Sequence, residues 1–163
     1  MTPVSYRTGP LLLAAVVFAL DRITKIAIER SVSVWDSYPI IPNVLNIVYT
    51  RNTGAAFGLL RDAPESVRLA VLVGGSMLIL LMIAWMLWRD QTPVRWALAL
   101  ILGGAAGNLY DRILIGSVTD FIQVFLGSYE WPSFNVADSA ICIGAVLIAL
   151  DLLKGRKYVP QAN

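Results

Sequence analysis

The sequence predicts an α-helical integral membrane protein with four transmembrane helices and a small extracytoplasmic layer that contains β-structure. Of its 163 residues, 57% are hydrophobic and only 15% are charged, whereas about 25% of a typical soluble domain is charged. Four stretches are long and apolar enough to cross a hydrocarbon core about 30 Å thick as helices. A chain of this composition would expose large apolar patches in water. We therefore expect residues 1–163 to form a single membrane-embedded domain.

The four predicted spans cover about residues 10–28, 67–88, 94–115 and 135–153. The second is the most apolar, with only Arg68 near its start. The first begins like a signal peptide, but Asp21 and Arg22 follow its apolar run where a small-residue cleavage site would be needed. We therefore predict that the first stretch is a membrane helix.

Positively charged residues indicate the orientation of the spans. Arg89 and Arg95 flank the short connection between the second and third spans, and Lys154 begins a basic C-terminal tail. The connection 116–134 has no Lys or Arg, although the longer loop 31–66 carries Arg51 and Arg61 together with three acids and directly follows Arg30. The positive-inside rule then predicts that both termini are cytoplasmic and that loops 31–66 and 116–134 are outside.

Loop 31–66 carries local signals of ordered structure. Tyr38-Pro39 and Ile41-Pro42 are typical of turns. The segment Val44–Thr50 is rich in β-branched residues and predicts a strand. The run Asp62-Ala63-Pro64-Glu65 predicts the start of a helix, with a capping acid. We expect this loop to lie on the membrane surface as a small layer.

Composition also excludes several kinds of chemistry. The chain has no histidine, which excludes Ser-His and Cys-His catalysis and the common histidine metal sites. The single cysteine, Cys142, excludes an internal disulfide, and its apolar surroundings predict core packing. A net charge of +2 without a basic run argues against nucleic-acid binding.

The polar residues of the spans fall at one predicted depth. A charge at the bilayer centre costs about 2.5–3.5 kcal/mol on insertion scales, so such groups must pair, lie near an interface or line a polar cavity. In the predicted orientation the following residues all reach the outer interface: Asp21, Lys25, Asn52, Gly54, Asn108, Asp111, Arg112, Asp120, Asn135 and Asp138. This convergence predicts one active site or binding pocket near the outer face.

Helical spacing supports the same prediction. Asn108, Asp111 and Arg112 stand at i, i+3 and i+4 and share a helix face, while Asp21 and Lys25 stand at i and i+4. A structural interpretation stays open for each set: Asp21 with Lys25 as an ion pair that fixes packing, and Asp111 with Arg112 as an interfacial pair with Arg112 snorkelling. One turn deeper, the small residues from Gly103 to Gly107 predict a close helix approach.

Asp120 and Asp138 are the hardest residues to explain structurally. Asp138 could be an acid at a helix start with Asn135 as N-cap, but Asp120 lies between apolar residues. Two adjacent carboxyls do not both ionise easily and share a proton, as in aspartic peptidases. Such a pair could activate water, with no metal or other cofactor.

Three other functions remain open from the residues alone. A small transporter or proton channel would use the intramembrane charges as a relay, but should place polar groups through the full bilayer depth. A Ser-Lys peptidase could use Ser139 or Ser117 with Lys25. A structural or assembly protein would use the same residues only for packing.

Five ordered blocks resemble the bacterial lipoprotein signal peptidase (signal peptidase II) family over essentially the whole chain. The blocks are Asp21-x-x-x-Lys25, Asn52-Thr53-Gly54-Ala55-Ala56-Phe57, Asn108-Leu109-Tyr110-Asp111-Arg112, Val118-Thr119-Asp120-Phe121 and Phe134-Asn135-Val136-Ala137-Asp138-Ser139. Tyr110 and Ala106 depart slightly from the expected pattern.

The resemblance implies an aspartic endopeptidase of the bacterial inner membrane that needs no cofactor. Its substrates would be prolipoproteins, cut just before a cysteine that carries diacylglycerol. Asp120 and Asp138 match the catalytic pair, and the remaining polar residues match supporting positions. The resemblance further implies contact with membrane lipids and inhibition by cyclic peptides such as globomycin. Because one chain contains both acids, we expect a monomer.

Overall fold

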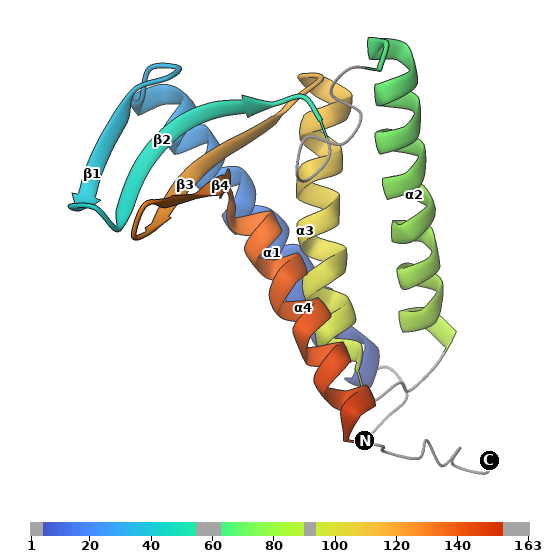
Figure 1. The fold of residues 1–163 in the computed structure, drawn as a ribbon. Coiled ribbons are helices and arrows are strands. Elements are labelled where there is room, and N and C mark those ends of the chain that lie inside the picture. The colour runs from blue at the N-terminus through green and yellow to red at the C-terminus, as the bar shows by residue number, and fades with distance from the viewer. Residues whose placement is uncertain (1–4, 55–62, 90–93, 155–163) are drawn as a thin grey trace.

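The computed structural model describes residues 5–54, 63–89 and 94–154. These residues form four helices and a four-stranded antiparallel sheet at one end of the helices (Figure 1). The helices are α1 (Ser5–Ser31), α2 (Glu65–Arg89), α3 (Arg95–Leu114) and α4 (Val136–Leu153). The strands are β1 (Ser37–Ile41), β2 (Leu45–Asn52), β3 (Val118–Leu126) and β4 (Tyr129–Phe134). The predicted fold class, four helices with a β-containing layer, is confirmed.

Three helices, α2, α3 and α4, are long and apolar enough to cross a membrane. The 27-residue α1 is longer than any of them but carries Asp21, Arg22 and Lys25. It packs mainly on α3, and α3 also packs extensively on α4. The first described residue of α1 and the end of α4 lie together at the end opposite the sheet (Figure 1).

The sheet runs in the order β1-β2-β3-β4, with every neighbouring pair antiparallel. Two strands come from each connecting loop, so the sheet joins segments that are far apart in sequence. Gly127, with φ of 64°, begins the two-residue turn between β3 and β4, where a positive φ suits glycine. The sheet lies against the ends of α1, α3 and α4 that are remote from the start of α1, and it holds them in a fixed relation to β3.

The structure corrects two predictions about the loops. Tyr38-Pro39 is not a turn, because both residues lie in β1; β1 is an edge strand, where the missing N–H of proline is tolerated. The segment 116–134, predicted only as a loop, is largely the β3–β4 hairpin. The predicted strand Val44–Thr50 is confirmed with small shifts, as β2. The α2 helix starts at Glu65, whereas Asp62 lies outside the described residues.

Glycines allow α3 to approach two helices at once. A Cβ at Gly103 would overlap the Ala14 carbonyl oxygen of α1, and one at Gly104 would overlap the Ala137 carbonyl oxygen of α4. The predicted close approach along the small-residue segment is therefore confirmed. It brings the polar face of α3 against both neighbours.

Cys142 is exposed on α4, which corrects its predicted core packing. The buried hydrophobic cluster among the described residues consists instead of Ile83 and Leu87 of α2 and Leu98 of α3. An apolar helix in a bilayer needs no buried face, so hydrophobicity did not separate core positions from lipid-facing ones.

Candidate active site

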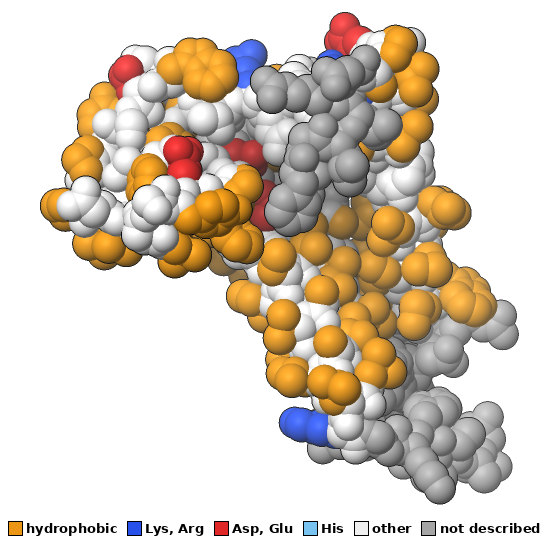
Figure 2. Space-filling model, viewed as in Figure 1, with side chains coloured by type: hydrophobic (Ala, Val, Ile, Leu, Met, Phe, Trp, Pro, Cys, Tyr) orange, Lys and Arg blue, Asp and Glu red, His pale blue; other side chains and the backbone are white. Residues whose placement is uncertain are grey.

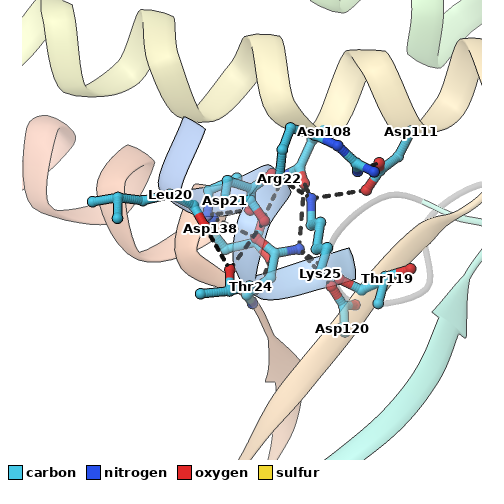
Figure 3. Close-up of polar contacts among 12 residues, drawn as sticks. Leu20, Asp21, Arg22, Thr24, Lys25, Asn108, Asp111, Thr119, Asp120 and Asp138 are labelled. Atoms are coloured by element: carbon cyan, nitrogen blue, oxygen red, sulfur yellow. Dashed lines mark hydrogen bonds and ion pairs between the residues drawn. The ribbon is translucent and has the colours of Figure 1, made fainter. Parts of the chain in front are cut away.

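Asp120 and Asp138 meet where the sheet joins the helices. Asp120 lies near the start of β3 and is only 3% exposed. Asp138 lies in the first turn of α4. Both carboxyls belong to the polar cluster shown in Figure 3, and acidic side chains are visible at this junction in Figure 2.

Asn135 connects the two carboxyls. Its Nδ2 donates to Asp120 Oδ1 over 2.7 Å, and its backbone N–H donates to Asp138 Oδ2 over 3.2 Å. Its Oδ1 accepts the backbone N–H of Asp138 over 2.9 Å, so Asn135 and Asp138 form a capping box at the start of α4. The predicted N-cap is confirmed. The start of one helix thereby fixes Asp138 and reaches across to Asp120.

Asn52 holds the other oxygen of Asp120. Its Nδ2 donates to Asp120 Oδ2 over 3.0 Å, and its Oδ1 accepts the backbone N–H of Gly54 over 3.0 Å. The carbonyl of Gly54 accepts a hydrogen bond from Arg112 Nη2 over 3.2 Å. Three predicted site residues, Asn52, Gly54 and Arg112, are therefore connected to Asp120 by this chain of hydrogen bonds.

A buried charge cluster lies beneath the aspartates, centred on Lys25 (Figure 3). Lys25 Nζ lies 2.8 Å from Asp21 Oδ2 and 2.8 Å from Asp111 Oδ2, and it donates to Asn108 Oδ1 over 3.0 Å. Asn108 Nδ2 in turn donates to Asp138 Oδ1 over 2.8 Å. Asn108 is therefore hydrogen-bonded both to Lys25 and to the Asp138 carboxyl.

Asp21 also braces the α4 end of the site. Its Oδ1 accepts the backbone N–H of Ala137 over 3.0 Å. That N–H belongs to the first turn of α4, where the helix itself provides no acceptor. Asp21 is completely buried, as is Lys25. The pair is therefore an ion pair that packs helices, as the structural interpretation expected, and it also positions the helix that carries Asp138.

Asp111 and Arg112 do not pair with each other, contrary to the interfacial-pair interpretation. Asp111 is completely buried, accepts a hydrogen bond from Arg22 and forms an ion pair with Lys25, both on α1, while Arg112 reaches Gly54. Adjacent helical residues point in directions about 100° apart, so the two side chains contact different neighbours.

The pKa of Asp120 is raised to about 7, mainly by burial and next by the nearby charge of Asp138. The hydrogen bonds from Asn52 and Asn135 act in the opposite direction, because they favour the ionised carboxylate. A carboxyl with this pKa can hold or release a proton near neutral pH. That property suits general acid–base chemistry.

Sequence reasoning missed three contributors to the site. Arg22 pairs with Asp111, and Thr119 donates to Glu29 of α1 over 2.7 Å. The Glu29 contact connects the C-terminal end of α1 to the strand that carries Asp120. The position of Arg22 beside Asp21 in a largely apolar span indicated a role in the site. Its partner, Asp111, lies on another helix and could be identified only from the fold.

The geometry does not support a Ser-Lys pair. The Ser139 hydroxyl donates to the carbonyl of Asn135 over 2.9 Å. Lys25 Nζ is held by the Asp21 and Asp111 carboxyls and the Asn108 amide oxygen, not by a serine hydroxyl. Within the described ranges 5–54, 63–89 and 94–154, no group of three or more Cys, Asp or Glu residues is placed to hold a metal ion.

Comparison with known proteins gives a consistent family match. The family described as signal peptidase (SPase) II matches residues 13–154. A lipoprotein signal peptidase of Solibacter usitatus (strain Ellin6076) is 47% identical, covering 93% of this chain and 94% of the relative. Another from Pseudomonas fluorescens is 40% identical, covering 96% and 94%.

Solved structures agree with the fold. A bacterial membrane enzyme determined by the in meso method at 2.3 Å resolution matches with a TM-score of 0.82 and 33% identity, covering 96% of this chain and 94% of that one. A second, at 1.9 Å resolution, matches with a TM-score of 0.80 and 34% identity, covering 91% and 95%.

Proposed function

This chain belongs to the signal peptidase II family, and we propose that it removes signal peptides from prolipoproteins with Asp120 and Asp138 as the catalytic pair. The observation that carries the assignment is the single asparagine, Asn135, that hydrogen-bonds to both carboxyls. Asn52, Asn108 and the charge cluster around Lys25 orient the pair.

The proposed mechanism uses one proton shared by the two carboxyls. The ionised member takes a proton from a water molecule while the protonated member donates to the scissile carbonyl oxygen. Water then attacks the carbonyl carbon, and the acids exchange roles as the tetrahedral intermediate collapses. The raised pKa of Asp120 supports a shared proton near neutral pH.

We propose that the substrate is a prolipoprotein whose cysteine already carries diacylglycerol, cut just before that cysteine. An apolar strand face starting at the site supports this substrate. The register shifts of the sheet fall on β2 and β4, so β3 alternates regularly, and Ile122, Val124 and Leu126 lie on the same face as Asp120. Trp131 and Tyr129 pair with Val124 and Leu126 and are half exposed. A diacylglyceryl group could lie along this face at the outer interface.

Orientation and partners are parts of the same proposal. The sheet and the acids face the outside of the bacterial inner membrane, and both termini are cytoplasmic. Membrane lipids surround the helices, and cyclic peptides such as globomycin inhibit by occupying the site. Residues 1–163 form one domain that acts as a monomer.

The test is cleavage of a diacylglyceryl-modified prolipoprotein by purified enzyme. Asp120→Asn and Asp138→Asn should each lower kcat by about 10²- to 10⁴-fold, the range for loss of general acid–base catalysis. Asp36→Asn, which removes an exposed acid of the same outer layer, should leave the rate unchanged. Near-normal turnover by either site variant would contradict the catalytic assignment.

A second comparison tests the lipid requirement. The same prolipoprotein without diacylglycerol should be cut far more slowly by the wild-type enzyme. Equal rates for the two substrates would leave the peptidase assignment intact and reject the proposed role of the lipid.

A further inference from the structure

Arg22 lies at the edge of the buried charge cluster and forms an ion pair with one of its members, Asp111. Its Nη1 donates to Asp111 Oδ1, on the carboxyl oxygen that Lys25 does not contact. The Arg22 side chain is 14% exposed, whereas that of Asp111 is fully buried. Asp111 therefore has two cationic partners on α1, one for each oxygen.

Two aromatic rings hold the Arg22 guanidinium in this position. Its Cζ lies 4.7 Å from the centre of the Tyr110 ring, a cation–π arrangement. Phe18 packs against the same ring edge-on, with the ring centres 5.9 Å apart and an interplanar angle of 78°. The stack fixes the guanidinium without using any group that contacts Asp120 or Asp138.

Arg22 brings the formal charge of the cluster to zero. Asp21 and Asp111 contribute two negative charges, and Lys25 and Arg22 contribute two positive ones. Without Arg22 a single ammonium would serve two buried carboxylates, and burying an uncompensated charge is strongly unfavourable. Lys25 would then be drawn toward Asp111 and away from Asn108, the residue that donates to Asp138.

We propose that Arg22 is a positioning residue for the aspartate pair: by neutralising Asp111 it keeps Lys25 on Asn108 and fixes the charge beneath the site. Arg22 acts through Asp111, Lys25 and Asn108 and does not touch the substrate. The inference rests on the proposed catalytic pair.

The sign of the electrostatic effect follows from the neighbouring charges. Among the described residues, the charged groups that face this region are Asp21, Arg22 and Lys25 of α1, Asp111 and Arg112 of α3, Asp120 of β3 and Asp138 of α4. The charge of Lys25 lowers the pKa of Asp120. Removing Arg22 subtracts a positive charge and moves Lys25 away, so both changes raise the pKa of Asp120.

The experiment measures kcat against pH for Arg22→Gln with a lipid-modified prolipoprotein. We expect about a tenfold lower kcat from misplacement of Asn108, and a pH profile displaced upward by about 0.5 pH unit or more. Arg30→Gln removes an exposed arginine from the same helix and should give the wild-type profile. A merely structural brace would lower stability or activity without moving the profile, and that result would overturn the proposal.

Two further variants keep the test decisive if Arg22→Gln folds poorly. Arg22→Lys retains the charge and should retain the wild-type pH profile; a displacement equal to that of Arg22→Gln would reject the charge argument. The double variant R22Q/D111N restores a neutral cluster, so its profile should return toward wild type.

If Asp120→Asn and Asp138→Asn stay active, the catalytic assignment has failed; if only the Arg22 profiles fail to move, this inference alone has failed.

Discussion

At the scale of single residues, asparagine amides do most of the positioning. Asn52, Asn108 and Asn135 each place a side-chain N–H on a carboxyl of the proposed catalytic pair, over 2.7 to 3.0 Å. An amide can donate and accept at the same time without adding charge. It can therefore orient two acids without the full positive charge that a lysine at the same distance would bring.

Asn52 gives a prediction about pH. Its hydrogen bond favours ionised Asp120 and lowers the pKa of that carboxyl, so Asn52→Leu should raise it. The pair needs one proton, and activity should fall as pH rises through the pKa of Asp120, about 7 in the wild-type protein. In the variant this decline should move to higher pH. The check is kcat/KM from about pH 5 to about pH 9.

The matched control for Asn52 is Asn46→Leu on the same strand. Asn46 donates to Ser37 and Gln123, away from the acids. Its pH profile should match that of the wild type. An unchanged profile for Asn52→Leu would mean that its hydrogen bond does not tune Asp120.

At the scale of elements, α3 is the helix on which the site is assembled. Its glycines bring α1 and α4 close, and its polar residues then meet Lys25, Asp138 and Gly54 from three other segments. The helix ends at Leu114 with Ile115 as C-cap, and Gly116, with a φ of 77°, then turns the chain into β3. A positive φ of this kind is typical of the residue after a helix end. The close packing of α3 and the geometry of the acids are therefore linked.

Substitution of Gly104 tests this link. Gly104→Ala would press a Cβ onto the Ala137 carbonyl at the start of α4, so we expect destabilisation by about 1–3 kcal/mol, typical of overpacking, together with reduced activity. Gly75→Ala on α2 meets nothing within 4 Å and should be neutral or stabilising by up to about 1 kcal/mol. Thermal unfolding in detergent compares the two variants. Equal stability would contradict the packing argument.

At the scale of the whole molecule, the buried polar residues among those described are confined to one end. The buried polar residues among those described lie at the junction of the helices with the sheet, while the helices present apolar side chains over their length (Figure 2). A relay across the membrane would need polar groups through the full depth. The arrangement instead suits a reaction at one interface.

Labelling of single cysteines tests the proposed orientation. In a Cys142→Ala background, Asn43→Cys places a thiol in the β1–β2 turn and Lys154→Cys places one at the end of α4. A membrane-impermeant maleimide added to spheroplasts should label position 43. It should label position 154 only after the membrane is permeabilised. The reverse pattern would invert the topology.

Local features were predictable from the sequence by itself. The lengths of the apolar stretches predicted the helices, and the i, i+4 spacing predicted the Asp21–Lys25 pair. The segment around Asn135 predicted a capped helix start. Each of these depends on residues within a few turns of one another. The depth at which the polar residues gather followed from composition and orientation, because charges are too unfavourable in hydrocarbon to be scattered. The catalytic roles remain predictions.

Only the tertiary structure decided which polar groups meet. Asp111 is next to Arg112 in sequence, yet it pairs with Arg22 and Lys25, and the chain around Asp120 forms a strand because β2 lies beside it. A buried charge pairs with whichever group the neighbouring element brings within reach, and a strand needs a hydrogen-bonding partner from elsewhere in the chain. Neither the ion-pair partners of Asp111 nor the strand beside Asp120 can be predicted from local sequence. The sequence therefore pointed to the acids, whereas only the fold revealed the hydrogen bonds and ion pairs that hold them.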